Sequence, residues 1–98
     1  MNMTQEYKTV AELLEDPKRW TQREDARAAN GNYTYPDSPD AVCWCLYGAM
    51  KKIYPDIYAY NAIRDTVIKK LNGGIVFWND ATGRTHEEVL NLCKELGI

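Results

Sequence analysis

The stretch SPDAVCWCLYGAMKKIY, residues 38–54, decides the fold that we predict for this chain. Ser38 is a good helix N-cap, Pro39 suits the first helical position, and Asp40 complements the helix dipole. Apolar residues then recur at the i, i+3, i+4 spacing of an amphipathic helix, namely Val42, Cys45, Leu46, Ala49, Met50 and Ile53. We therefore predict one helix, from Ser38 to about Tyr54, that carries much of the core.

Three further helices are predicted around this stretch. The first covers about residues 4–15, with Thr4 as its N-cap, and Asp16-Pro17 ends it because a residue before proline avoids the helical region. The second covers about residues 56–71 and stops at an Asn-Gly-Gly turn. The last begins at Thr85, where the sequence Thr-His-Glu-Glu matches a capping box.

Two segments between the helices are less regular. Asn30-Gly31 is a strong hairpin-turn signal, so we expect short strands near residues 24–29 and 32–35, with a structured loop as the alternative. The apolar run at residues 75–78 fits either a short strand or a buried lead-in to the last helix. The predicted fold class is α+β, with about four helices around one core and a small β-hairpin after the first helix, in a single domain of residues 1–98.

Composition and charge exclude several function classes. The 98 residues carry a net charge of −2, which argues against nucleic acid and anionic membrane as partners. No apolar run approaches the roughly 20 residues that cross a bilayer, and residues 1–9 lack the apolar region of a signal peptide. We therefore expect a cytoplasmic protein without membrane contact, whose three cysteines stay as thiols.

Two motifs resemble those of a known family. Trp44-Cys45-Leu46-Tyr47-Gly48-Ala49 has the pattern W-C-x-x-G-A, and Trp78-Asn79-Asp80 followed by Arg84-Thr85 and Glu88-Val89-Leu90 has the pattern W-N-D…R-T-x-E-E-V-L. With the first helix and Trp20-Thr21, they resemble a family of small bacterial proteins, notably actinobacterial, and phage proteins that is classed as a domain of unknown function. The resemblance implies a self-contained domain of bacterial or phage origin. It implies no activity, cofactor or partner.

The cysteines and the one histidine are the residues that could form a zinc site or a nucleophilic pair. Cys43 and Cys45 lie within the predicted helix, where residues two apart point about 200° away from each other, so they do not favour one metal. Cys43 with His86 lacks an orienting third group. We predict Cys45 to be a small buried core residue and Cys43 a half-buried one, with no catalytic residue, no metal and no cofactor.

The loop between Trp78 and Thr85 is the most site-like feature of the sequence. Trp44, Trp78, Asn79, Asp80 and Arg84 are the candidate ligand-binding residues, because amide, carboxylate and guanidinium groups before a helix suit a small anion or a partner's carboxylate. The alternative is that these side chains close the turn and cap the helix. A glycine at 48 inside a helix indicates a close neighbour, which we expect to be a ring such as Trp20 or Trp78.

The leading hypothesis for function is a non-enzymatic interaction or regulatory module with a protein partner or a second copy of itself. It depends on the absence of a convergent catalytic set and on the tyrosines Tyr33, Tyr35, Tyr54 and Tyr58, which we expect to include exposed rings of the kind found at interfaces. The alternative is a small-ligand-binding protein or a minor enzyme with a site near Trp44, Asp80 and Arg84.

Overall fold

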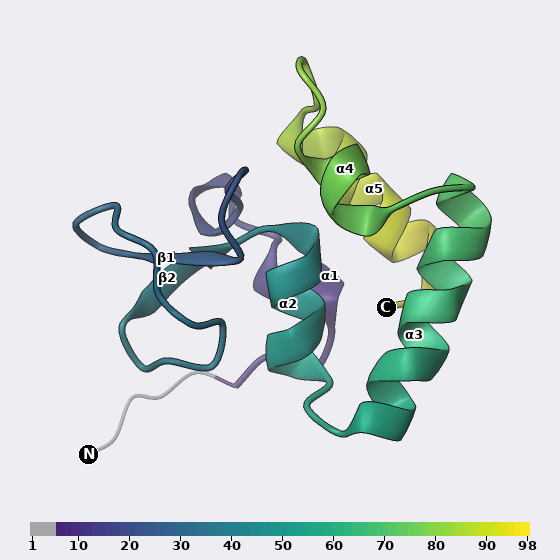
Figure 1. Cartoon of the computed structure of the whole chain (residues 1–98), viewed down its shortest axis with the longest axis horizontal. Coiled ribbons are helices and arrows are strands. Elements are labelled where there is room, and N and C mark those ends of the chain that lie inside the picture. Colours follow the sequence, from purple (N-terminus) through teal and green to yellow (C-terminus); the bar gives the residue numbers. More distant parts are fainter. Residues whose placement is uncertain (1–5) are drawn as a thin grey trace.

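The chain folds with helix α2 at its centre, as the computed structural model shows for residues 6–98. In Figure 1 the β1–β2 sheet lies on one side of α2 and α3 runs along the other, while α4 and α5 overlap near the top of the view. The elements are α1 Val10–Leu13, the 3-10 helix η1 Pro17–Arg19, β1 Ala26–Ala28, β2 Ala41–Trp44, α2 Leu46–Ile53, α3 Ile57–Leu71, α4 Ile75–Asn79 and α5 His86–Leu96. The predicted α+β class is confirmed.

The first helix is shorter than predicted because a cap closer to the core defines it. The side-chain oxygen of Thr9 accepts a hydrogen bond from the backbone N–H of Glu12, and the Glu12 carboxylate accepts one from the backbone N–H of Lys8 at 2.9 Å. These bonds satisfy amides that the helix itself leaves unpaired. The N-cap predicted at Thr4 lies outside the described residues.

The turn at Asn30-Gly31 and the strand before it are confirmed, since β1 lies within the predicted residues 24–29, but the strand predicted at residues 32–35 does not form. Gly31 adopts φ 88°, and the Ala28 N–H donates to the Asn32 carbonyl at 2.8 Å. The segment after the turn contributes only an isolated bridge between Arg27 and Tyr33. The main partner of β1 is β2, antiparallel, with Ala26 opposite Trp44 and Arg27 opposite Cys43.

The helix predicted from Ser38 begins only at Leu46, which is a correction to the sequence analysis. Ser38 caps a turn, since its hydroxyl accepts from the Asp40 N–H at 3.1 Å. Residues 41–44 then become a strand because their backbone groups pair with β1. Val42, which the helical pattern had assigned to the core, is 46% exposed in this strand, whereas Trp44 is only 5% exposed.

Helix α2 starts at a cysteine cap and passes close to the backbone of another segment. The Cys45 sulfur accepts from the Gly48 N–H at 3.3 Å. A Cβ atom at Gly48 would lie 1.9 Å from the carbonyl oxygen of Asp25, and that oxygen also accepts from the Cys45 N–H at 3.1 Å. The close approach expected at Gly48 is confirmed, and the neighbour is a backbone carbonyl rather than a tryptophan ring.

The two longest helices agree with the sequence pattern. Helix α3 is capped by Asp56, whose carboxylate accepts from the Ala59 N–H, and it ends at Asn72 in the left-handed conformation. Helix α5 has the complete capping box between Thr85 and Glu88.

The apolar run at residues 75–78 is neither a strand nor an irregular lead-in, as the two predictions had it, because it forms the short helix α4. No helix in the described part of the chain is long and apolar enough to cross a membrane.

One hydrophobic core connects all these elements. Its buried members are Val10, Leu13, Leu14, Ala26, Trp44, Leu46, Ala49, Met50, Tyr60, Val67, Ile75, Val89, Leu92, Cys93 and Ile98. The two ends of the described chain meet in this core, where the Val10 N–H donates to the Ile98 carbonyl. The hydroxyl of Tyr54 donates to the same carbonyl at 3.2 Å. These bonds link α1 and the C-cap of α2 to Ile98, two residues after the end of α5.

Candidate functional site

The side chain of Asn79, the last residue of α4, is a buried polar group. It is 0% exposed. Its oxygen accepts from the indole N–H of Trp20 at 2.8 Å and from the Leu46 N–H at 3.0 Å. Its amide nitrogen donates to the Thr21 carbonyl at 3.2 Å and to the Asp80 carboxylate at 2.9 Å. Both donors and both acceptor positions of the amide are thus used inside the protein.

Neighbouring groups extend this network, which we call the Asn79 junction: residues 20–23 against residues 78–81. The Gln22 side chain donates to the carbonyl oxygens of Asn79 and Ala81, at 2.9 and 3.3 Å. The Arg23 N–H donates to the Asp80 carboxylate at 2.9 Å, and Arg23 adopts the left-handed φ of 76°. Asp80 therefore holds a strained backbone segment in place.

The guanidinium of Arg84 lies over Trp78 at the edge of the Asn79 junction. Its carbon is 4.0 Å from the ring centroid, and its Nε donates to the Trp78 carbonyl at 2.9 Å. A further nitrogen lies 3.5 Å from the Glu88 carboxylate. Hydrogen bonding from the Thr85 backbone, together with the charge of Arg84, lowers the pKa of Glu88 below its ordinary value. Arg84 thus joins α4 to the first turn of α5.

The W-N-D and R-T motifs therefore meet at one place in the structure. A model of a family of unknown function, DUF6197, matches residues 2–96. The chain belongs to this family. The predicted resemblance to a domain of unknown function is thereby confirmed. No curated protein and no solved structure matches the chain.

In this DUF6197 member the fifth candidate residue, Trp44, lies apart from the other four. Its indole N–H donates to the Pro36 carbonyl at 2.8 Å, and the Lys52 ammonium is 5.4 Å from its ring centroid. Its backbone carbonyl accepts from the Thr21 N–H at 3.0 Å, so only the main chain of Trp44 reaches the Asn79 junction. The structure brings Trp78, Asn79, Asp80 and Arg84 together and directs the Trp44 indole to the loop at Pro36.

The thiols and the histidine occupy structural positions. Burial raises the pKa of Cys45 to about 11 and that of Cys93 to about 12, which disfavours the reactive thiolate. The Nε2 atom of His86 hydrogen-bonds the Leu14 carbonyl. Cys43 is half-buried, as predicted, but it lies in the strand β2 and not in the helix that the sequence analysis predicted. Residues 6–98 contain no group of three or more His, Cys, Asp and Glu side chains that suits a metal ion.

An exposed aromatic surface on α4 was not predicted. The side chain of Phe77 is 85% exposed and that of Val76 is 44% exposed, and we call this pair the α4 surface. Hollows of about 600 and 310 Å³ lie beside Phe77. It follows from the burial of Ile75 and Asn79, which are one helical turn apart and so put the two residues after Ile75 on the outer side of α4.

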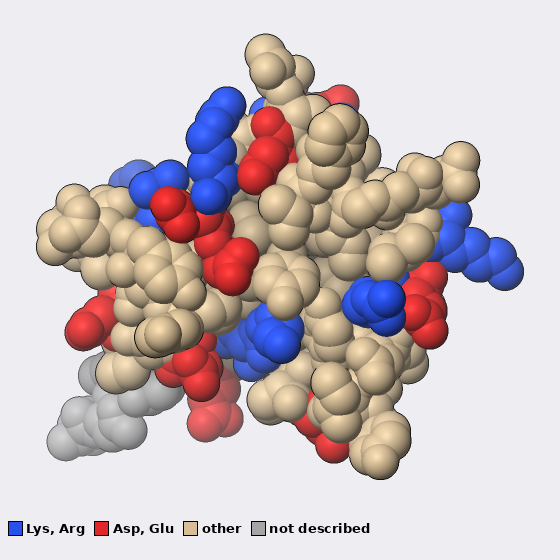
Figure 2. Space-filling view, in the orientation of Figure 1, with Lys and Arg blue, Asp and Glu red and all other residues tan. Residues whose placement is uncertain are grey.

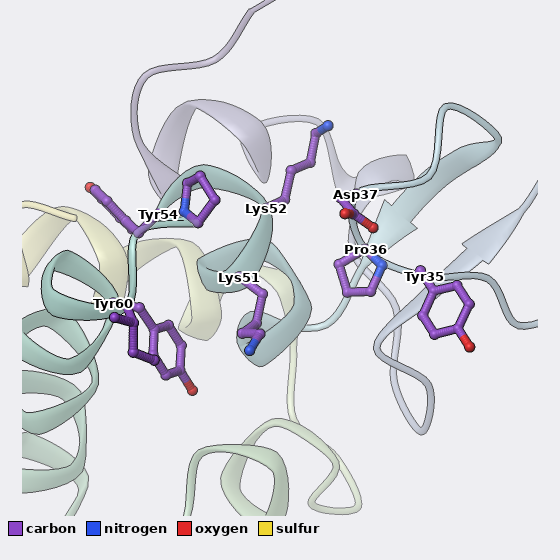
Figure 3. Close-up of a pocket in the computed structure, with 9 residues that line it drawn as sticks. Tyr35, Pro36, Asp37, Lys51, Lys52, Tyr54 and Tyr60 are labelled. Atoms are coloured by element: carbon purple, nitrogen blue, oxygen red, sulfur yellow. The ribbon is translucent and has the colours of Figure 1, made fainter.

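Another hollow lies between the loop before β2 and the connection from α2 to α3. Its volume is about 410 Å³, and we call it the Lys51 pocket. It is lined by Tyr35, Pro36, Asp37, Lys51, Lys52, Tyr54, Pro55, Ile57 and Tyr60. Figure 3 shows these residues arriving from the loop, from α2 and from the start of α3. Of the four tyrosines expected to include exposed rings, Tyr33, Tyr35 and Tyr58 are exposed and Tyr54 is half-buried.

Proposed function

We propose that the protein is a non-enzymatic interaction module that docks a protein partner on the α4 surface. The observation that carries the proposal is the 85% exposure of Phe77, beside Val76 at 44%. A large aromatic ring on an ordered helix is exposed to water here, and a partner that covered the ring would remove this apolar surface from water. Aromatic residues of this kind supply much of the binding energy at protein interfaces.

The chemistry of the described residues supports a binding role over a catalytic one. The Asn79 amide has no free donor or acceptor position, and the carboxylate of Asp80 accepts hydrogen bonds from two groups. The thiols of Cys45 and Cys93 are buried with a raised pKa. The Nε2 atom of His86 is engaged by a backbone carbonyl. The groups that commonly perform acid, base or nucleophilic chemistry are thus used to stabilise the fold.

The surface charge supports a protein partner rather than a nucleic acid. On the face shown in Figure 2, lysine and arginine side chains alternate with aspartate and glutamate, and uncharged surface separates them. A nucleic-acid surface would need a continuous basic stripe. The same proposal includes a cytoplasmic protein, which the three free cysteines support, and a bacterial or phage origin, which the resemblance of the two motifs supports.

Site-specific photo-crosslinking in the source organism tests the docking proposal. A benzophenone-bearing phenylalanine analogue at position 77 keeps a ring at the α4 surface. We expect one dominant crosslinked product there, either a homodimer or one heterologous protein. The matched control carries the same analogue at Tyr58, an aromatic position on α3 that is 82% exposed and lies outside the hollows beside Phe77.

A second variant separates docking from random encounter. Val76→Asp places a charge beside the crosslinking ring without touching the core, because Val76 is exposed. The product at position 77 should then fall by about tenfold or more, since one buried unpaired charge costs at least 1.4 kcal/mol at an interface. Equal products at positions 77 and 58, or a product that Val76→Asp leaves unchanged, would show that the α4 surface has no specific partner.

A small-ligand site is the second candidate function, and the hollow of about 310 Å³ beside α4 favours it. Trp78 and Arg84 line this hollow, while Asp80 lines the neighbouring one. A metabolite that binds there would raise the melting temperature of the protein. Arg84→Ala and Asp80→Ala should abolish that increase, provided that each variant is folded in the absence of the metabolite. If the shift persists in both variants, the ligand binds elsewhere.

A further inference from the structure

The Lys51 pocket has a different character from the α4 surface, because its walls are aromatic and its charge is basic. In Figure 3, Lys51 lies between Tyr60 on one side and Pro36 with Tyr35 on the other. Tyr60 is 7% exposed and gives the pocket a fixed wall, whereas Tyr35 is 68% exposed and forms an outer rim. The volume of about 410 Å³ is in the range of pockets that bind small molecules.

The lysines of this pocket lack an anionic partner. Among residues 6–98, the carboxylates that form ion pairs pair with Arg19, Arg64, Lys70 and Arg84, and none pairs with Lys51 or Lys52. The Lys51 ammonium is instead 5.0 Å from the ring centroid of Tyr60 and 5.9 Å from that of Tyr47. Such cation–π contacts orient an ammonium without neutralising it.

The charges around Lys51 leave the pocket basic overall. Asp37 is the one carboxylate among the lining residues, and in Figure 3 it lies on the side of Lys52, whose ammonium points away from that of Lys51. Asp25 is near enough for the charge of Lys51 to oppose the rise in the Asp25 pKa that burial causes. No ion pair joins Asp25 to Lys51, so the ammonium keeps room for a second acceptor.

Helix position alone explains part of this arrangement. Lys51 and Lys52 lie in the last turn of α2, where a positive charge opposes the negative end of the helix dipole. The dipole does not explain why the ammonium stands in a hollow lined by tyrosines. Lys69 has the same position in the last turn of α3 and lines none of the hollows described above. Comparing Lys51 with Lys69 therefore distinguishes binding of a ligand from stabilisation of the helix C-terminus.

We propose that the Lys51 pocket binds a small molecule with a flat ring and a carboxylate group. The carboxylate bonds to the Lys51 ammonium, and the ring packs against the tyrosine walls. Stacking on aromatic faces suits a flat ring, and the unpaired ammonium selects an anion over a neutral analogue. The site is separate from the α4 surface, so the inference stands whether or not the docking proposal is correct.

Titration of ¹⁵N-labelled full-length protein, followed by NMR, tests this inference. The probes are 2-naphthoate, which has a flat two-ring body and a carboxylate, and 2-naphthalenemethanol, which has the same body and no charge. We expect 2-naphthoate to shift amide signals of residues 35–37 and 51–60 and to bind at least about tenfold more tightly than the alcohol. Equal affinity for the two probes, or shifts confined to other residues, would overturn the proposal.

Three variants make the charge requirement specific. Lys51→Gln removes the ammonium and should weaken 2-naphthoate binding to the level of the alcohol, about tenfold. Lys51→Arg keeps the charge and should retain most of the binding, whereas Lys69→Gln is the matched control and should change nothing. Both positions are exposed, so each of the three variants should keep the fold of the wild type in the absence of a probe. Wild-type affinity in Lys51→Gln, or an equal loss in Lys69→Gln, would refute the assignment.

Discussion

Gly48→Ala sets two well-known effects against each other, and the structure decides which is larger. Alanine favours a helix interior over glycine by about 1 kcal/mol, so propensity alone predicts a more stable variant. Gly48 lies in α2, however, where the added methyl group would stand 1.9 Å from the Asp25 oxygen and 2.8 Å from its carbonyl carbon. We expect the steric effect to dominate.

The size of the effect follows from the distances. Carbon–oxygen contacts are ordinarily about 3.3 Å or longer, so the two backbones must separate by about 1.4 Å. That movement breaks the hydrogen bond from the Cys45 N–H to the Asp25 carbonyl, now 3.1 Å long, which is worth about 1 kcal/mol. Overpacking costs a further 1–3 kcal/mol or so. After the propensity gain is subtracted, the net loss is about 2 kcal/mol.

Thermal unfolding followed by circular dichroism measures this loss. For a domain of this size, about 2 kcal/mol lowers the melting temperature by roughly 8–16 °C. Gly73→Ala is the matched control, because a Cβ there meets no atom within 4 Å, and its melting temperature should change little. A Gly48→Ala variant as stable as the wild type, or more stable, would refute the close backbone approach.

Three other perturbations test the remaining structural claims. Asn79→Ala leaves the part-buried indole N–H of Trp20 and the buried backbone N–H of Leu46 without acceptors, so urea denaturation should show a loss of about 2–6 kcal/mol. Because the folded state lowers the Glu88 pKa, its stabilisation is complete above the unfolded value of about 4.5 and is lost as the pH falls through the folded value. Glu88→Gln should therefore flatten the acid side of the stability curve, and an unchanged curve would argue against the bond to Thr85. Finally, Cys45 and Cys93, with pKa values of about 11 and 12, should resist iodoacetamide at pH 8 in the native protein, as mass spectrometry can show, and react once urea unfolds it.

Sequence reasoning worked where the structural signal is local. Thr85 and Glu88 form the capping box that starts α5, and the Asn-Gly-Gly turn ends α3. Both helix ends were therefore predicted correctly from neighbouring residues. It failed at residues 41–44, where apolar spacing fits a helix as well as a strand. What selects the strand is backbone pairing with residues 26–28, which lie in the strand predicted before the hairpin turn but whose partner was predicted to be residues 32–35. Tertiary pairing thus overrode the helical pattern.

The candidate site illustrates the same limit more strongly. The W-N-D and R-T motifs were recognised, and the meeting of Trp78 with Arg84 follows from their nearness in the chain. The partners of Asn79 were not foreseeable, because Trp20 and Thr21 lie 59 and 58 positions away. An asparagine in a polar loop has the same sequence signature whether it is exposed or buried. The Lys51 pocket was also missed, since its lining comes from three separate segments.

The Asn79 junction has a consequence for the order in which the molecule assembles. Its hydrogen bonds to residues 20–22 close loops of 57–59 positions, and loops of that length carry a large entropic cost. The turn at Asn30-Gly31 and helix α3 close much shorter loops and are expected to form sooner. On the ribosome, the segment at Trp20 must wait until residue 79 has left the exit tunnel. Until then the indole N–H of Trp20 lacks its acceptor at Asn79. Nascent chains that stall before this point are therefore the forms most exposed to aggregation and proteolysis.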